Sequence, residues 1–252
     1  MSSQEIYRKF AQYYDAYVGS FDADLPLYKS LCCSAQDILE IGCGTGRVLR
    51  PMLEFGLHVT GIDISNEMLN VARSRLSKYL EDGTLRLMNH DFRESPLSEK
   101  YDCALVTFYT FNYLLTESDQ HSFLLNVQKI LTSTGILVMD LFYPQSLVQS
   151  DTAGCWNESL LDREGASVVL KQKRQMFGPI EKRTQIYTEG SHREEIITER
   201  RYVSKQDVEV LLKNAGFTDI RMTDEYDEAG LHSLADGETT DSAFVCVATG
   251  AV

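Results

Sequence analysis

The sequence feature that most constrains the fold is a short apolar run that stops at three closely spaced glycines. Residues 38–41 are apolar apart from one acid, which is typical of a strand buried in a parallel sheet. Gly42, Gly44 and Gly46 follow, and apolar residues at helical spacing begin at Val48. A strand, a glycine turn and a helix bring a ligand against bare backbone and a helix N-terminus. Glycine is needed where a Cβ would block that approach or where φ is positive.

The glycine spacing distinguishes between two kinds of nucleotide ligand. In the dinucleotide fingerprint G-x-G-x-x-G, the third glycine packs the helix on the strand. This chain has Arg47 at that position, its last glycine one residue earlier at Gly46, and an acid, Glu40, two residues before the first glycine. The pattern Glu-x-Gly-x-Gly-x-Gly resembles motif I of the class I S-adenosylmethionine (SAM) methyltransferases. A glycine turn without a ligand is the alternative, although such a triplet weakens a fold that needs no close approach.

The composition limits the class of partner. The chain has 252 residues, of which 43% are apolar, so it can form one α/β domain or two small ones. Its formal net charge of −13 argues against a nucleic-acid partner, because phosphate contacts need a basic surface. The charge is compatible with a small or cationic substrate. We therefore expect a small-molecule partner and a monomer or homodimer.

Metal and membrane sites are not indicated by the sequence. None of the 6 cysteines forms a C-x-x-C pair, and His58 and His90 have no acidic or cysteine partner at metal-ligand spacing. The N-terminal residues are polar and aromatic, unlike a signal peptide, and no apolar run is long enough to span a bilayer. We therefore expect no metal, no membrane association and a cytoplasmic location with reduced thiols.

Two helices are expected before the first strand. Residues 4–18 carry aromatic side chains at near-helical spacing, and residues 24–33 have Pro26 in the first turn. Both can lie over the carboxyl edge of the sheet as a lid, and ordinary helical cover is the alternative. Residues 10–17 resemble the A-x-x-Y-D start of many small-molecule methyltransferases. In those proteins the tyrosine of the Tyr-Asp pair reaches the methyl-transfer centre, which implies this role for Tyr14.

A second strand, residues 57–63, ends in Asp63. A carboxylate at the end of this strand accepts both hydroxyl hydrogens of a ribose, a geometry shared with dinucleotide folds. The alternative is that Asp63 caps the next helix, but Ser65 or Asn66 is available for that. After a third strand come Asp91 and Phe92. The resemblance implies that Asp91 accepts from the adenine amino group and Phe92 packs on the ring, whereas chemistry alone favours a turn for Asp91.

A fourth strand, residues 101–107, runs into the aromatic stretch 108–113. In an open parallel sheet this end faces the ligand crevice, so we predict a small-molecule pocket. A hydrophobic loop packed under the lid is the alternative. The Asn/Asp-Pro-Pro-Tyr/Phe signature of amino-methylating nucleic-acid enzymes is absent, which counts against base methylation. We expect Tyr109 to orient the nucleophile or contact the sulfonium, as Tyr14 does, and Asn112 to hold the substrate.

The segment 143–203 changes to alternating residues with regular turn signals, which predicts three or four inserted antiparallel strands. No linker or repeat divides the chain, so we predict one domain over 1–252, with a helical lid at 1–34 and a β insertion at 143–203. The lid and insertion are similar to those of glycine-type and aminosugar N-methyltransferases. The resemblance implies an α/β, Rossmann-like sheet of seven strands in the order 3-2-1-4-5-7-6, with helices on both faces and strand seven antiparallel.

The resemblance implies methyl transfer from SAM by in-line displacement, with catalysis by positioning and an amine or guanidine nitrogen as acceptor. The residues predicted to bind SAM are Tyr14, Glu40, Gly42, Cys43, Gly44, Gly46, Asp63, Ile64, Met68, Asp91, Phe92 and Thr107. Those predicted to contact the acceptor are Tyr17, Phe108, Tyr109, Asn112 and Tyr113, with Tyr14, Tyr109 and Asn112 as catalytic residues. Three alternatives remain: an O-methyltransferase, a non-catalytic SAM-binding protein and a nicotinamide oxidoreductase. A titration with NADH tests for the oxidoreductase.

Overall fold

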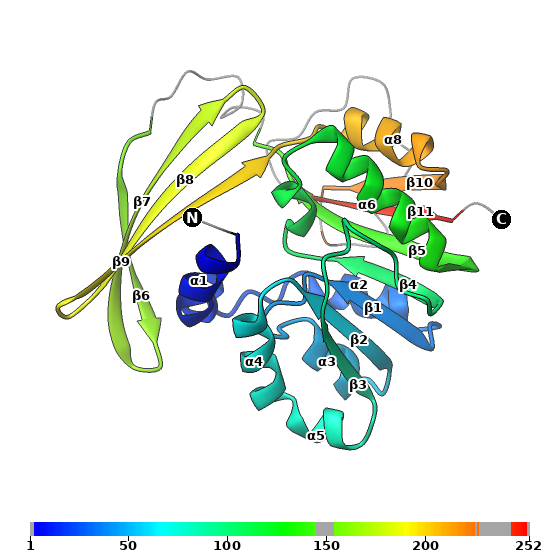
Figure 1. The fold of residues 1–252 in the computed structure, drawn as a ribbon, viewed down its shortest axis with the longest axis horizontal. Helices are drawn as coiled ribbons and strands as arrows, with labels where there is room; N and C mark the ends of the chain where they lie inside the picture. The colour runs from blue at the N-terminus through cyan, green and yellow to red at the C-terminus, as the bar shows by residue number, and fades with distance from the viewer. Residues whose placement is uncertain (1–2, 145–153, 225, 227–242, 251–252) are drawn as a thin grey trace.

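The computed structural model describes residues 3–144, 154–224, 226 and 243–250, which form two sheets and the helices around them (Figure 1). The larger sheet contains β1 (Asp37–Ile41), β2 (His58–Asp63), β3 (Leu85–Asn89), β4 (Tyr101–Val106), β5 (Leu131–Phe142), β10 (Thr218–Thr223) and β11 (Ala243–Thr249). The smaller sheet contains β6 (Asn157–Arg163), β7 (Ala166–Phe177), β8 (Ile180–Glu189) and β9 (His192–Arg201). The helices are α1 (Ser3–Val18), α2 (Leu25–Cys32), α3 (Leu49–Glu54), α4 (Asn66–Arg75), α5 (Ser77–Glu81), the 3₁₀ helix η1 (Thr110–Tyr113), α6 (Glu117–Ile130) and α8 (Lys205–Asn214).

The order of the larger sheet confirms the prediction. Its strands run β3-β2-β1-β4-β5-β11-β10, which is 3-2-1-4-5-7-6 when only this sheet is counted. The pairs among β1 to β5 are parallel, and β11 is antiparallel to both β5 and β10. The chain crosses from β3 to β4 on the far side of β1. The strand order therefore reverses between β1 and β4, where open α/β sheets form their ligand crevice.

Helices cover both faces of this sheet, as the apolar burial on both sides of its strands requires. On one face, Phe123 and Leu124 of α6 and Leu212 of α8 belong to a buried cluster with strand residues. On the other face, Leu49 of α3 and Tyr28 of α2 belong to a second cluster. In the structure α2 packs on this face of the sheet, and the expectation that it forms part of a lid stays a prediction.

The position of α2 follows from its short apolar face. Leu27, Tyr28 and Cys32 are buried, and the Sγ atom of Cys32 lies 3.3 Å from that of Cys103 in β4. The hydroxyl of Tyr28 donates to Asp140 Oδ2 of β5 at 2.8 Å. These contacts hold α2 against the sheet, whereas α1 lies at the carboxyl edge, where it lines the cavity described below.

The inserted strands form a four-stranded antiparallel sheet, within the predicted range of three or four strands. In Figure 1 helix α1 lies between this sheet and the larger one. Phe10 and Tyr13 of α1 form a third buried cluster with insertion residues such as Tyr187 and with Met68 of α4. The rings of Tyr13 and Tyr187 stack with their centroids 4.3 Å apart. The insertion therefore holds α1 in place, although the exact boundaries predicted for both segments stay predictions.

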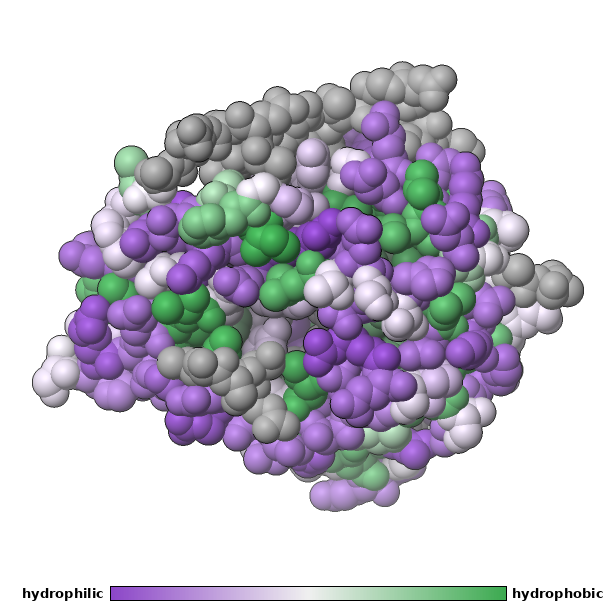
Figure 2. Space-filling model, turned by 45° about the horizontal axis from the view of Figure 1, so that its top comes forward, coloured by the Kyte–Doolittle hydropathy of each residue, from purple (hydrophilic) through white to green (hydrophobic). Residues whose placement is uncertain are grey.

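The surface is mostly hydrophilic on the face shown in Figure 2, where hydrophobic residues form small separate groups. Within the described ranges, no helix combines the length and the apolar character needed to cross a bilayer.

We predict that Tyr13→Ala destabilises the fold, because Tyr13 is fully buried against Tyr187. Truncating a buried aromatic side chain costs about 3–5 kcal/mol of unfolding free energy. Phe177→Ala is the matched control, since that ring is 60% exposed and its loss should change stability by less than about 0.5 kcal/mol. Urea unfolding of both variants measures the difference, and equal midpoints would mean that α1 does not depend on the insertion.

Candidate active site

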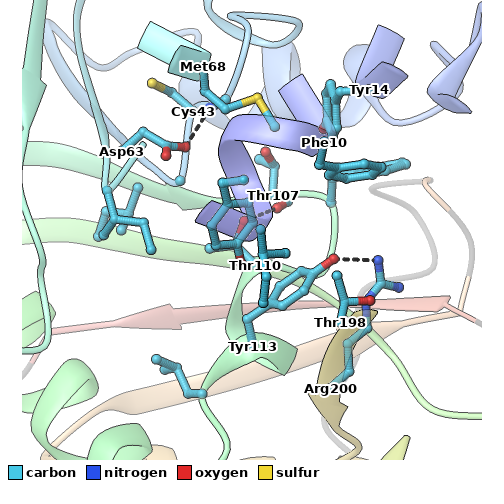
Figure 3. Close-up of a pocket in the computed structure, with 18 of the residues that line it drawn as sticks. Phe10, Tyr14, Cys43, Asp63, Met68, Thr107, Thr110, Tyr113, Thr198 and Arg200 are labelled. Carbon is cyan, nitrogen blue, oxygen red and sulfur yellow. Dashed lines mark hydrogen bonds between the residues drawn. The ribbon is translucent and has the colours of Figure 1, made fainter. Parts of the chain in front are cut away.

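A cavity of about 500 Å³ lies at the carboxyl edge of the sheet, beside the reversal between β1 and β4 (Figure 3). Its wall is built by four parts of the chain: α1, the loops after β1 to β4, η1, and the strands β8 and β9. The cavity is where the fold predicts a ligand, and most of the predicted site residues line it. These are Tyr14, Tyr17, Glu40, Gly42, Cys43, Gly44, Asp63, Ile64, Met68, Asp91, Phe92, Thr107, Phe108 and Tyr113.

The three glycines of the loop all have positive φ angles, of 78° at Gly42, 54° at Gly44 and 87° at Gly46. A Cβ on Gly42 would lie 2.5 Å from the Thr110 side chain, so Gly42 allows η1 to approach the loop. A Cβ on Gly44 would meet nothing closer than Tyr14 at 3.9 Å, which leaves its backbone open to the cavity. Of the three, Gly44 alone combines positive φ with free space for a ligand.

Gly46 lies on the side of the loop that faces α4. It is not among the residues that line the cavity, and a Cβ there would lie 2.9 Å from Leu76 Cδ1 and 3.5 Å from Ala72 Cβ. The contact of Gly46 with the cofactor stays a prediction. The small size of Gly46 lets the turn pack closely against α4.

Glu40 is buried and only half satisfied. Its Oε1 accepts a hydrogen bond from Thr107 Oγ1 at 2.9 Å, whereas its Oε2 has no partner among the described residues. Burial raises the pKa of Glu40 to about 8, against the lowering effects of the Thr107 bond and the Arg47 charge. A buried carboxylate oxygen that faces a cavity without a donor fits a ligand cation, such as the α-ammonium group of SAM.

Asp63 fastens the glycine loop to the end of β2. Its Oδ2 accepts from Gly44 N at 2.9 Å, and its Oδ1 accepts from Ser65 N at 2.8 Å. Ser65, not Asp63, caps α4, because its Oγ accepts from Met68 N at 3.2 Å. Each carboxylate oxygen has a further lone pair, so Asp63 keeps the capacity to accept from two ribose hydroxyls. Burial raises the pKa of Asp63, whereas the hydrogen bonds from Ser65 N and Gly44 N lower it. These donors therefore stabilise the charged form of the carboxylate.

Asp91 and Phe92 lie at the next strand end, with Ile64 and Met68 in the same cavity wall. The Asp91 carboxylate pairs with Arg93, whose Nη2 donates to Oδ2 at 2.5 Å, and this hydrogen bond lowers the pKa of Asp91. Phe92 is buried in edge contact with Phe123. Apolar side chains next to a carboxylate are what an adenine site requires, because the ring packs on the apolar side chains and its amino group donates to the carboxylate.

Aromatic rings surround the middle of the cavity. Tyr14 packs edge-on against Phe10 and Phe108, with centroids 5.5 Å and 6.3 Å away. Burial raises the pKa of Tyr14 well above its ordinary value, so its hydroxyl stays protonated at neutral pH. Phe108 and Tyr109 have φ angles of 50° and 65°, a strained conformation for residues with side chains. The bond from Tyr109 N to Asp140 Oδ1, at 2.7 Å, helps to hold this turn.

Tyr109 and Asn112 are not among the residues that line the cavity, and their predicted contacts with the acceptor stay predictions. Asn112 is fully buried, donates from Nδ2 to Arg201 O at 2.8 Å and accepts from Phe142 N at 3.0 Å. Its amide therefore joins η1 to β9 and β5. The Tyr109 ring stacks on Phe108 on the side away from the cavity, toward Phe142.

Helix α1 is tied to the glycine loop by polar contacts. Asp15 accepts from Thr45 Oγ1 at 2.8 Å and forms an ion pair with Arg75 of α4 at 2.7 Å. These bonds place Tyr14 over Gly44.

Several lining residues were missed by the sequence analysis: Arg47, Arg93, Thr110, Lys182, Thr198 and Arg200. Arg47 forms a two-bond ion pair with the buried Asp24, at 2.9 and 2.6 Å, and lies over the Phe108 ring. The insertion residues alternate along their strands, but alternation does not say which face meets the cavity. No cluster of three or more metal-ligating side chains occurs in the part of the chain that the structure describes.

The strand order with its antiparallel β11, together with the glycine loop and the strand-end carboxylates, defines the fold of the class I SAM-dependent methyltransferases. Residues 38–135 match the family model described as "Methyltransferase domain". The chain is 30% identical over 139 residues to the putative methyltransferase YqeM of Bacillus subtilis, across 54% of this chain and 55% of that protein. Proteins named as O-methyltransferases also match about half of the chain.

Two solved structures cover nearly the whole chain. The CcbJ methyltransferase from Streptomyces caelestis has a TM-score of 0.82 at 18% identity, over 100% of both chains. SAM-bound CalS10, an amino pentose methyltransferase from Micromonospora echinaspora, has a TM-score of 0.69 at 19% identity, over 94% of this chain and 96% of that one. These similarities show the fold, including the insertion. The chain spans about half the length of the curated relatives it matches.

Substitutions of Gly44 and Gly46 should separate cofactor binding from folding. In Gly44→Ala the added Cβ enters the cavity, so we expect SAM affinity to fall at least tenfold, with about 1–2 kcal/mol of stability lost to the positive φ. In Gly46→Ala the same strain adds to a contact with Leu76, so stability should fall further while the folded fraction still binds SAM. Calorimetry and thermal unfolding measure both; equal SAM affinities would place the ligand elsewhere.

The charge of Glu40 should make SAM binding depend on pH. The pKa of about 8 keeps the carboxyl protonated at pH 6–7, and an ammonium ligand favours the carboxylate, so SAM affinity should rise as the pH rises toward 8. Glu40→Gln should weaken SAM binding and remove the part of the pH dependence of SAM affinity that comes from Glu40. The pH dependence that comes from ionisation of SAM itself should be the same in both proteins. An identical pH profile in both would contradict a contact with Glu40.

The same pKa makes an opposite prediction for stability without ligand. A folded-state pKa above the unfolded value means that stability is full below about pH 4.5 and falls as the pH rises toward 8. Glu40→Gln should therefore unfold at a higher temperature than the wild-type protein at pH 8. Thermal unfolding without ligand checks this, and a lower midpoint would mean that the carboxylate is satisfied in the free protein.

Proposed function

We propose that this protein is a SAM-dependent methyltransferase that methylates an amine nitrogen of a small molecule. The observation that carries the proposal is the unpartnered Oε2 of Glu40 in a cavity that also presents the open backbone of Gly44 and the carboxylate of Asp63. The Glu40 oxygen suits a cation, the Gly44 backbone allows a ligand to approach closely, and the Asp63 carboxylate suits a diol. SAM carries an ammonium group and a ribose diol on one molecule. The methyltransferase fold and the family match of residues 38–135 support the same function.

The residues that would hold SAM follow from this match. Glu40 would accept from the α-ammonium group, and Asp63 from the ribose hydroxyls. Ile64, Met68 and Phe92 would enclose the adenine, with Asp91 as acceptor for its amino group. When bound, SAM supplies an electrophilic methyl group on a sulfonium.

The protein's own contribution to the chemistry would be positioning and exclusion of water. Orienting two reactants supplies roughly 7–11 kcal/mol without any covalent step. Tyr14, Tyr17, Phe108 and Tyr113 wall the space where the nucleophile would approach. Because Tyr14 keeps its proton, its hydroxyl would act as a hydrogen-bond partner that orients the nucleophile and not as a base.

Nitrogen is favoured over oxygen as the nucleophile. An amine can lose its proton to water before it attacks, whereas an alcohol needs a base placed at its oxygen. Among the described residues at the acceptor end, the aromatic wall offers no carboxylate or histidine except Glu199, which is exposed and stands opposite Lys182 in the β8–β9 pairing. The full-length similarity to an amino pentose methyltransferase supports this choice.

O-methylation and SAM binding without catalysis are the competing functions, the first because of the relatives named as O-methyltransferases. Incubation of the protein with SAM and panels of amines and alcohols, read as release of S-adenosylhomocysteine, tests all three. Faster turnover of neutral alcohols would favour oxygen, and binding without turnover of any panel or cell extract would favour a non-catalytic role. The cytoplasmic location, the monomer or homodimer and the lack of a nucleic-acid partner stay predictions.

We predict that Tyr14→Phe binds SAM within about threefold of the wild-type affinity but loses at least tenfold in kcat, because one positioning hydrogen bond is removed. Tyr13→Phe is the matched control, since Tyr13 lies on the same helix but does not line the cavity. Steady-state kinetics on the best amine and calorimetry with SAM measure both effects. Full kcat in Tyr14→Phe would remove Tyr14 from the mechanism.

A further inference from the structure

The insertion brings two polar side chains, Thr198 and Arg200, into the wall of the cavity. They lie two residues apart on β9 and therefore on the same face of the strand. In Figure 3 they lie beside Tyr113, away from Asp63 and Cys43. This places them at the end of the cavity that the cofactor residues leave open.

Arg200 is a buried cation without a carboxylate partner among the described residues. Its side chain is only 6% exposed, and its Nη2 donates to Tyr113 Oη at 2.6 Å. The nearest candidate across the sheet is Glu181, which pairs with Arg200 in the β8–β9 register. The Glu181 carboxylate is already occupied by Arg183 Nε and Tyr202 Oη, both at 2.7 Å.

Two donors at this end of the cavity remain unused. Arg200 Nε and Thr198 Oγ1 are both buried and have no partner within the described part of the chain. Leaving a buried charge and its hydrogen bonds unsatisfied costs several kcal/mol, so such groups usually have a partner in the functional state. Glu199 and Lys182, which also line this end, contribute one charge of each sign and do not compensate Arg200.

We propose that Arg200 and Thr198 bind an anionic group of the acceptor, a carboxylate or a phosphate, carried on the same molecule as the methylated amine. The planar guanidinium donates from Nε and a terminal nitrogen in the geometry that matches an oxyanion, and the Thr198 hydroxyl adds a third donor. The proposal rests on the proposed function and narrows its substrate class.

The charge of Arg200 has a second consequence for the reaction. A cation in this buried position disfavours a nearby protonated amine and lowers its pKa, which raises the fraction of neutral amine that can attack. The same charge disfavours a guanidinium acceptor, whose proton is not lost at neutral pH. The acceptor class is thus an amine with an acidic group, and a plain cation is excluded despite the net charge of −13.

The test uses sodium acetate and inorganic phosphate as probes on the full chain saturated with S-adenosylhomocysteine, at constant ionic strength. Titration calorimetry should show saturable binding of at least one anion to the wild-type protein. Arg200→Gln should weaken that binding at least tenfold, and Thr198→Val should weaken it by a smaller factor. Lys171→Gln is the matched control, because it removes a charge from the same sheet, does not line the cavity, and pairs with Glu158 and not with Glu181. The relative affinity of the two anions identifies the carboxylate or the phosphate.

Three results would overturn the proposal. The first is equal anion affinity in wild-type and Arg200→Gln proteins, or none in the wild-type protein. The second is anion binding that disappears when S-adenosylhomocysteine is present, which would assign Arg200 to the cofactor's own carboxylate. The third is a drop in the unfolding midpoint of Arg200→Gln as large as that of Tyr13→Ala, which would make Arg200 structural. We expect that midpoint to equal or exceed the wild-type value, because an unpaired buried charge is removed.

Turnover separates this proposal from the proposed function. Ethylamine is compared with β-alanine, and ethanolamine with O-phosphoethanolamine, by kcat/KM in wild-type and Arg200→Gln proteins. Anion binding at Arg200 without turnover of any amine would support the anion site at Arg200 and contradict N-methylation, so the anion would belong to another kind of ligand. If plain amines are methylated and their turnover is unchanged in Arg200→Gln, N-methylation would be supported and the anion site at Arg200 would be contradicted.

Discussion

The hydrogen bond from Gly44 N to Asp63 Oδ2 is the contact on which the site depends. It joins the turn after β1 to the end of β2, and it forms only because Gly44 adopts a positive φ with its backbone uncovered. The same carboxylate holds Ser65 N and so the start of α4, while Asp15 ties α1 to the adjacent Thr45. A single loop thus fixes the backbone that would meet the cofactor and the helix that covers it.

The cavity has two chemically different ends, built by different parts of the fold. The sheet supplies strand-end carboxylates, including the half-satisfied Glu40, which suit a ligand with an ammonium and a diol. The insertion supplies the opposite charge, through Arg200, and packs on α1 through Tyr187 and Tyr13. On the function proposed above, cofactor recognition would fall to the sheet and acceptor recognition to the insertion.

The sequence predicted the parts of the site whose backbone is special or whose position is set by strand order. The glycine loop and Asp63 follow from local periodicity and parallel-sheet topology, whereas the seven-strand order was implied by the resemblance to class I methyltransferases. The packing of α2 and of Asn112 was not predictable from the sequence, because tertiary contacts decide it: α2 buries Tyr28 on the sheet, and the Asn112 amide is bonded to the backbone of Arg201 and Phe142. Arg200 was not predictable, because alternation along β9 does not reveal which face of the insertion meets the cavity.

A crystal structure of the protein with S-adenosylhomocysteine tests the central claim most directly. The account predicts the cofactor's ammonium within hydrogen-bond distance of Glu40 Oε2, its ribose hydroxyls on Asp63 and its adenine against Phe92. It also predicts that Arg200 Nε and Thr198 Oγ1 remain free of the cofactor. A cofactor carboxylate bound to Arg200, or an ammonium placed away from Glu40, would contradict the account of a two-ended cavity.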